Sequence, residues 1–183
     1  MAMGTMMVAS NVVLFQIGWF SCVLSAGAHQ PWIGLFVTMG VVLTHVLRAP
    51  VPTMELKLVF VALAIGLVFD SILVWQGWLT YSSGILLPNI APYWIVAMWG
   101  LFATLLNVSL RWMRGHWLTA VLLGALGGPA AYYGGLRLGA LEFGNMPAGL
   151  TALAIGWAVL TPLLLALSIR FDGHADQLEM RAA

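Results

Sequence analysis

Long apolar stretches separated by short polar ones run through this chain from end to end. Within each stretch the apolar residues are continuous and do not alternate with polar ones, which favours helices over the strands of a membrane barrel. Each stretch is close to the roughly 20 residues that a helix needs to cross a bilayer. The pattern predicts six transmembrane helices, over Met6–Gly27, Pro31–Leu47, Leu58–Trp78, Pro92–Trp112, Trp117–Leu141 and Gly149–Ile169.

The predicted helices are joined by short pieces rich in Pro, Gly, Ser and Asn, a composition typical of turns. The six helices and these connections use nearly all of the 183 residues. We therefore expect a single all-α transmembrane domain over residues 1–183, in which residues 170–183 form a short polar cytoplasmic tail. The connections are expected at residues 28–30, 48–57, 80–91, 113–116 and 142–148.

The composition agrees with a membrane protein. Apolar residues make up 62% of the chain and charged residues only 7%, against about 25% charged residues in a soluble domain. Seven basic residues against six acidic ones leave no electropositive surface for nucleic acid. The lone cysteine, Cys22, excludes an intramolecular disulfide and a cysteine zinc site.

The distribution of basic residues predicts the orientation. With six crossings, one side of the membrane carries all the basic residues except Arg137, which lies near the end of the fifth helix. The positive-inside rule then places both termini in the cytoplasm. The residues on the cytoplasmic side are Arg48, Lys57, Arg111, Arg114, Arg170 and Arg181.

A cleaved signal peptide is the alternative interpretation of the first apolar stretch. Ala26-Gly27-Ala28 has the small residues that a signal peptidase accepts. However, no Lys or Arg precedes the stretch, and it is longer than the usual 7–15 residues. We therefore expect the first stretch to be retained as a transmembrane helix.

Asp70 is the most costly residue to place inside the third predicted helix. An acidic group near the centre of a span costs about 2.5–3.5 kcal/mol on insertion scales, so it must face protein or a water-filled cavity. At about 1.5 Å per residue it lies about 18 Å from the inner boundary, in the outer half of the membrane. Gly66 and Gly77 share its face, where a neighbouring helix or a ligand can come close.

The fifth predicted helix offers polar partners at the depth of Asp70. These are Tyr132 and Tyr133, with Arg137 one turn beyond Tyr133. One hypothesis is an Asp70–Arg137 ion pair with Tyr133 between them. The alternative is a protonated Asp70 that is hydrogen-bonded between helices, with Arg137 at the membrane interface.

A second polar stripe descends the fourth predicted helix through Thr104, Asn107 and Arg111, and Asn11 belongs to a similar stripe on the first helix. Small and polar stripes are how transmembrane helices pack together, with Asn and Ser bonding across helices. The other interpretation makes the stripes the wall of a cavity for a polar headgroup.

Glycines form a seam on the fifth predicted helix. Two G-x-x-x-G steps surround Pro129, which removes a backbone donor and is expected to kink the helix in mid-membrane. Tight helix packing explains such a seam more often than transport does. The glycines of the seam are Gly124, Gly128, Gly135 and Gly139.

The histidines do not predict a metal site. His29 and His45 lie at opposite ends of the second helix, about 24 Å apart if that helix is straight. A cluster of His45 with His116 and His174 on the cytoplasmic side is conceivable, but no helical metal-binding motif supports it. No nucleotide-binding or nucleophile motif is present either. We expect no metal and no cofactor.

Several short motifs together give a resemblance to a known family. They are Asn11-Val-Val-Leu-Phe-Gln16, Thr44-His45, Phe69-Asp70-Ser71, the run Phe102 to Leu110, and Gly127-Gly-Pro129-Ala-Ala-Tyr132. In this combination the chain resembles the family catalogued as domain of unknown function 2878, from about Asn11 to Ala166. The resemblance implies a bacterial inner-membrane protein with no established activity, and it supplies no catalytic residues.

Three functions from different classes fit these features, and none of them names a reaction. The first is a membrane accessory or scaffold protein with an intramembrane polar site and a membrane-protein partner. The second is a lipid-binding or lipid-modifying protein with a polar pocket at Asp70, Tyr133 and Arg137. The third is a small-solute or proton-coupled carrier that titrates Asp70. All three have membrane lipids as neighbours and no nucleic acid as a partner.

Overall fold

The computed structural model describes residues 2–175, which form six α-helices and one two-stranded ribbon. The predicted all-α class is confirmed, with one helix for each apolar stretch. Part of the expected polar tail, including Arg181, lies outside the described residues. The helices are α1 (Ala2–Gly27), α2 (Pro31–Arg48), α3 (Pro52–Trp75), α4 (Tyr93–Leu106), α5 (Trp117–Arg137) and α6 (Met146–Arg170).

Two helix boundaries differ from the prediction in ways that matter for the site. Helix α3 begins at Pro52 and not at Leu58, because proline suits the first turn of a helix, where its missing N–H would have no partner. Glu55 therefore lies inside α3 and not in a turn. Helix α4 ends at Leu106, and the chain then turns into the short 3-10 helix η1 (Arg111–Met113), so the predicted helix to Trp112 was too long.

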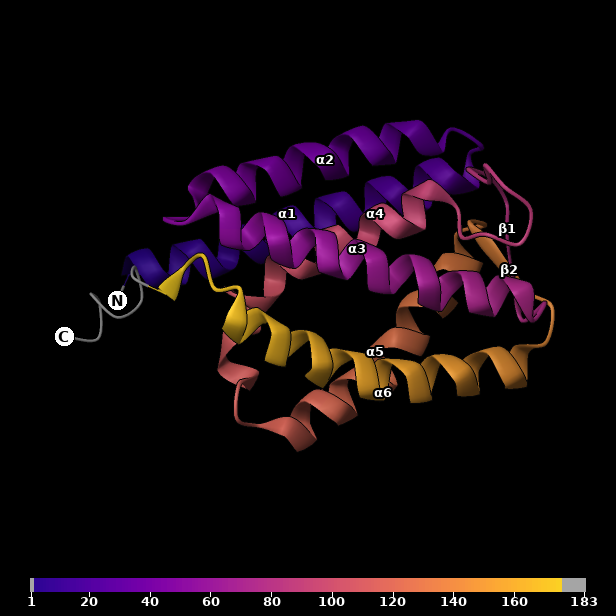
Figure 1. The fold of residues 1–183 in the computed structure, drawn as a ribbon. Helices are drawn as coiled ribbons and strands as arrows, with labels where there is room; N and C mark the ends of the chain where they lie inside the picture. The colour runs from indigo at the N-terminus through magenta and orange to yellow at the C-terminus, as the bar shows by residue number, and fades with distance from the viewer. Residues whose placement is uncertain (1, 176–183) are drawn as a thin grey trace.

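Helix α4 is the interior element of the bundle. It contacts α1, α2, α3 and α6, and Figure 1 shows it between the α1–α2 pair and the α5–α6 pair. Its 14 residues span about 21 Å at about 1.5 Å per residue, less than the hydrocarbon core of a bilayer. Irregular backbone after a short helix is tolerated at membrane depth where protein surrounds it.

The helices alternate in direction along the bundle. Helix α1 packs on α2, α3 on α4, and α5 on α6. Figure 1 shows that α1 begins and α6 ends at one end of the bundle, whereas the ribbon closes the opposite end. The two ends are called below the terminal end and the ribbon end.

The ribbon was not predicted, because its strands fall in or next to segments expected as turns. Strand β1 (Leu79–Tyr81) pairs antiparallel with β2 (Leu141–Phe143), with Tyr81 opposite Leu141. Each strand directly follows a helix, α3 or α5. The ribbon thus brings the ends of α3 and α5 together and turns Tyr81 into the bundle, where it is buried.

Four helices have the length and the apolar composition to cross a membrane. They are α1 over Gly4–Gly27, α2, α3 and α6, whereas α4 is apolar but shorter. Many of their large apolar side chains are exposed, including Phe36 and Phe60. Exposed apolar surface of this kind is what lipid covers.

The glycine seam of α5 packs against α6. A Cβ atom at Gly124 would lie 2.2 Å from the carbonyl oxygen of Trp157, and one at Gly128 would lie 2.3 Å from the Trp157 ring. Gly135 faces Leu141 instead, and Gly139 follows the helix with a φ of +77°. Helix α5 extends on both sides of Pro129. The absent side chains at Gly124 and Gly128 let the α6 backbone and the Trp157 ring approach α5.

The seam predicts opposite effects for two adjacent substitutions. Gly128→Ala should lower the free energy of unfolding in detergent by about 1–3 kcal/mol, because the new methyl group overlaps Trp157. Gly127→Ala should leave it unchanged or raise it by about 0.5–1 kcal/mol, because nothing lies within 4 Å of its Cβ position and alanine favours a helix. Equal losses of stability in the two variants would contradict the packing described here.

Candidate functional site

Asp70 lies in α3 with no exposed surface and is surrounded by hydrogen-bond donors. The hydroxyls of Tyr81 and Tyr132 donate to its Oδ1 at 2.8 and 2.7 Å, and the indole N–H of Trp99 donates to its Oδ2 at 2.7 Å. These three donors come from β1, α5 and α4. The carboxyl group therefore joins four elements of the fold, and this set is called below the Asp70 cluster.

A glycine makes room for the indole donor. Gly66 lies one turn before Asp70 on α3, and a Cβ atom there would lie 2.0 Å from Trp99. Trp99 also stacks on Trp157 of α6, with ring centroids 4.6 Å apart and planes inclined by 15°. The expectation that a neighbouring element approaches Asp70 at Gly66 is confirmed. Gly77 does not share this face, because α3 ends at Trp75 and Gly77 lies in a turn with a φ of +67°.

The proposed ion pair between Asp70 and Arg137 is not formed, and this corrects the hypothesis. Both Asp70 oxygens accept hydrogen bonds from other residues, and Arg137 is exposed at the end of α5. Tyr133 is 45% exposed whereas Tyr132 is 5% exposed, because successive side chains point about 100° apart around a helix. Arg137 lies on the outward face with Tyr133. The arrangement matches the alternative, an acid hydrogen-bonded between helices.

A cavity of about 470 Å³ lies beside the Asp70 cluster, between α1, α4, α5 and α6. Trp99 and Tyr132, both donors to Asp70, form part of its wall. The remaining surface is almost entirely apolar or aromatic, with Phe15 and Trp19 from α1 and Trp157 from α6. This size and lining are typical of a site for a small apolar molecule.

The cavity has an opening and a few polar atoms. Gln16 of α1 and Leu123 of α5 line it and are exposed, so the cavity reaches the surface between these helices. Deeper inside, the hydroxyl of Thr161 and the indole N–H of Trp157 are buried and have no hydrogen-bond partner among the described residues. Buried polar atoms without partners are costly, and a polar group of a ligand could satisfy them.

The second polar stripe divides into two parts. In the first part, Asn11 of α1 donates from Nδ2 to the carbonyl oxygen of Thr104 at 3.0 Å, and Ser109 donates to Oδ1 of Asn11. Farther along α1, Cys22 contacts the Thr38 hydroxyl of α2 at 3.1 Å. These contacts join helices, as the packing interpretation of the stripes expects.

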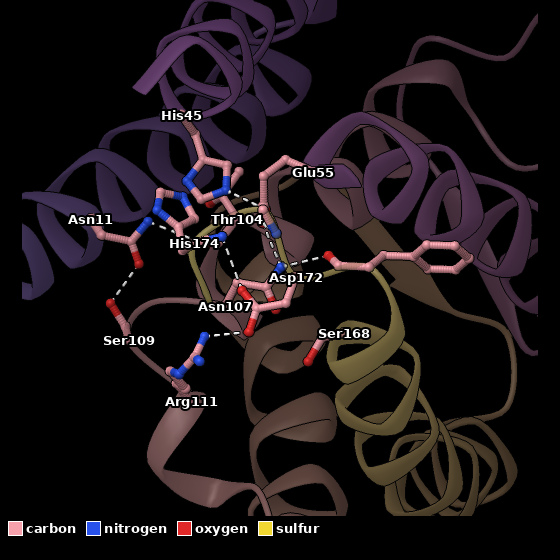
Figure 2. A network of polar contacts seen from close by, with 12 residues as sticks. Asn11, His45, Glu55, Thr104, Asn107, Ser109, Arg111, Ser168, Asp172 and His174 are labelled. Carbon is pink, nitrogen blue, oxygen red and sulfur yellow. Dashed lines mark hydrogen bonds and ion pairs between the residues drawn. The ribbon is translucent and has the colours of Figure 1, made fainter. Parts of the chain in front are cut away.

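The second part of the stripe surrounds another buried acid, Glu55, which the sequence did not single out. Asn107 donates from Nδ2 to Glu55 Oε1 at 2.6 Å and to the carbonyl oxygen of Phe171 at 2.9 Å. Asn107, at the end of α4, thus links Glu55 of α3 to the residues that follow α6. Figure 2 shows these residues next to Glu55. Nearby, Arg111 and Arg114 both bind the carboxylate of Asp172.

Two histidines complete this group at the terminal end of the bundle. Nε2 of His45, from α2, lies 2.8 Å from Oε2 of Glu55. The ring of His174 lies beside that of His45, with centroids 5.1 Å apart. We call His45, Glu55 and His174 the His–Glu cluster. The sequence suggested His45 and His174 as neighbours, but with His116, which is exposed and lies outside the cluster. For Glu55 the one signal was Pro52, which as a helix start would have placed Glu55 on a helix.

The Asp70 cluster predicts unequal effects for two neighbouring tyrosines. Tyr132→Phe should lower the free energy of unfolding by about 1.5–3 kcal/mol, since it removes a hydrogen bond to a buried carboxyl group. Tyr133→Phe is the matched control and should change it by less than about 0.5 kcal/mol, because that side chain lies at the surface. Chemical unfolding in a mild detergent measures both. If Tyr133→Phe lowered the free energy of unfolding as much as Tyr132→Phe does, the cluster would not stabilise the fold in this way.

Comparison with known proteins supports the family resemblance. The family model described as Protein of unknown function (DUF2878) matches residues 8–163, a range that contains the Asp70 cluster and the cavity but ends before Asp172 and His174. No match was found among curated proteins or among solved structures. Since the match covers most of the chain, the protein belongs to the DUF2878 family of unknown function.

Proposed function

We propose that this protein is a multi-pass protein of the bacterial inner membrane that binds the apolar chain of a lipid in the cavity between α1 and α5. The single observation that carries the proposal is the apolar cavity of about 470 Å³ in a bundle of which four helices, α1, α2, α3 and α6, have the length and composition of membrane spans. Ligand sites commonly have volumes of about 300–1,000 Å³ and an apolar lining with few polar groups.

The opening of the cavity supports a ligand that comes from the bilayer. Its rim includes Gln16, Leu123 and Gly127 on the faces of α1 and α5. If α1 and α5 both cross the membrane, the opening lies against the acyl chains, so a lipid chain can enter sideways without passing through water. The unpartnered Thr161 hydroxyl would then bond a carbonyl or hydroxyl group of the bound molecule.

The topology proposed for this function has six crossings and both termini in the cytoplasm. The helices alternate in direction, and α1 starts at the same end of the bundle at which α6 ends (Figure 1). Both features agree with an even number of crossings. At that end, Arg48 is the last residue of α2, Lys57 lies near the start of α3, and Arg111 and Arg114 lie between α4 and α5. Arg137 lies at the ribbon end. The positive-inside rule then puts the terminal end in the cytoplasm.

Lipid binding fits the site better than the carrier and accessory functions. A carrier needs its titrating acid to meet solute from both sides, whereas Asp70 has no exposed surface and accepts three hydrogen bonds. The accessory function requires a surface for a partner and gives the internal apolar cavity no role. In the lipid-binding function, Asp70 fixes Trp99 and Tyr132, which form the cavity wall.

Filling the cavity mouth tests the proposal. Gly127→Leu places a large side chain at a position where a Cβ atom meets nothing within 4 Å and which lines the cavity. We expect the lipid retained by the purified protein to fall about tenfold, equivalent to about 1.4 kcal/mol of binding free energy, as measured by native mass spectrometry and by analysis of extracted lipid.

Gly40→Leu provides the matched control. Gly40 lies on α2, its Cβ position is also open, and it does not line the cavity, so its variant should retain lipid like the unmodified protein. Gly40→Leu should unfold at or above the temperature of the unmodified protein, because leucine favours a helix over glycine. In Gly127→Leu the same gain is offset by the loss of the stabilisation that bound lipid gives. If Gly127→Leu retains lipid like Gly40→Leu, the cavity is not the lipid site.

A further inference from the structure

The His–Glu cluster gathers three metal-ligating side chains from distant parts of the chain. His45 comes from α2, Glu55 from α3, and His174 from the segment that follows α6. All three are buried, and one ligand atom from each lies within 4.8 Å of the others. In Figure 2 the two imidazole rings lie next to each other, beside the Glu55 carboxylate.

The two oxygens of Glu55 have different surroundings. Oε1 accepts hydrogen bonds from Asn107 Nδ2 at 2.6 Å and from the backbone N–H of Gly173 at 2.8 Å. Among residues 2–175, the one hydrogen-bond partner of Oε2 is the His45 ring, at 2.8 Å. A metal-binding carboxylate commonly has one oxygen held in this way by neighbouring donors while the other binds the ion.

His174 points to a missing ligand independently of Glu55. The residue is 2% exposed, and neither nitrogen of its ring has a hydrogen-bond partner among the described residues. Buried imidazole nitrogens are seldom left without partners, and an unseen ion or water is one of the usual reasons.

The segment that carries His174 is held in place without help from its ring. The backbone N–H of His174 donates to Oδ1 of Asp172 at 3.0 Å, and Asp172 Oδ2 binds Arg111 and Arg114. The backbone N–H of Val51 donates to the carbonyl oxygen of Gly173 at 3.1 Å. The ring is thus presented to Glu55 and His45 by contacts that a substitution of the ring leaves intact.

A small cavity of about 100 Å³ adjoins both histidines. Asn11 and Arg48 also line it, so polar groups are available to a water molecule or an anion inside. The space exceeds the roughly 30 Å³ that a water molecule occupies in the liquid. An ion bound by the His–Glu cluster would therefore have a free coordination position that faces this cavity.

We propose that the His–Glu cluster binds a divalent first-row transition-metal ion, through a ring nitrogen of His45, one of His174 and Oε2 of Glu55. Two histidines and one carboxylate are a common ligand set for Zn²⁺ sites with an open position and for non-haem Fe²⁺ sites. Bonds of about 2.0–2.2 Å place ligand atoms about 3–4 Å apart. The ligand atoms lie within 4.8 Å of one another, so shifts of about 1 Å would close the site. The fourth position is filled by water or by an anion next to Arg48.

The main test measures Zn²⁺ binding to the full-length protein in detergent after treatment with a chelator. We expect one Zn²⁺ ion per chain by elemental analysis and calorimetry, and a higher unfolding temperature when Zn²⁺ is added, since a ligand of the native state stabilises it. His174→Ala should weaken binding by at least about 100-fold and abolish the shift in unfolding temperature. An anaerobic titration with Fe²⁺ identifies which of the two ions binds more tightly.

His116→Ala is the matched control, because His116 is an exposed histidine outside the cluster and its loss should leave the Zn²⁺ affinity unchanged. Glu55→Gln is a second cluster variant, since it retains an acceptor for Asn107 and Gly173 but loses the anionic ligand. The proposal is overturned if the unmodified protein binds neither ion stoichiometrically. It is also overturned if the folded His174→Ala and Glu55→Gln variants bind Zn²⁺ as tightly as His116→Ala.

Discussion

The burial of two acidic side chains on one apolar helix is the constraint on which this structure depends. Glu55 and Asp70 both lie in α3 with no exposed surface, about 22 Å apart along the helix at about 1.5 Å per residue. An acidic side chain that meets no hydrogen-bond donor is very costly in an apolar interior, and more so in lipid. Each acid therefore requires donors from other elements, and these contacts draw the bundle together around α3.

The two acids meet this requirement in different ways. Asp70 accepts hydrogen bonds from Tyr81, Trp99 and Tyr132, whose aromatic rings then form part of the core and of the cavity wall. Glu55 is instead surrounded by polar groups, including a ring nitrogen and a backbone N–H. The result is an apolar cavity near one acid and a polar cluster that contains two histidines around the other.

Several features of the site follow from the amino-acid sequence. The cost of an acid in an apolar helix singled out Asp70, and its depth pointed to the part of α5 that contains Tyr132. The sequence did not choose correctly between Tyr132 and Tyr133, because the rotation of α5 decides which of them points inward. Tyr81 was missed because its strand lies in a segment expected as a turn, and Glu55 because the start of α3 was placed after it.

The sequence by itself determined the class of the fold, the six helices and the family, because these depend on local hydropathy and on motifs within single segments. Only the tertiary structure decided which donors meet each acid, where the cavity lies, and that His174 joins His45 and Glu55. Those contacts join residues far apart in the chain, and they depend on helix rotation and on the return of the chain after α6. Periodicity within one segment carries no information about how helices rotate against one another or about where the chain returns after α6.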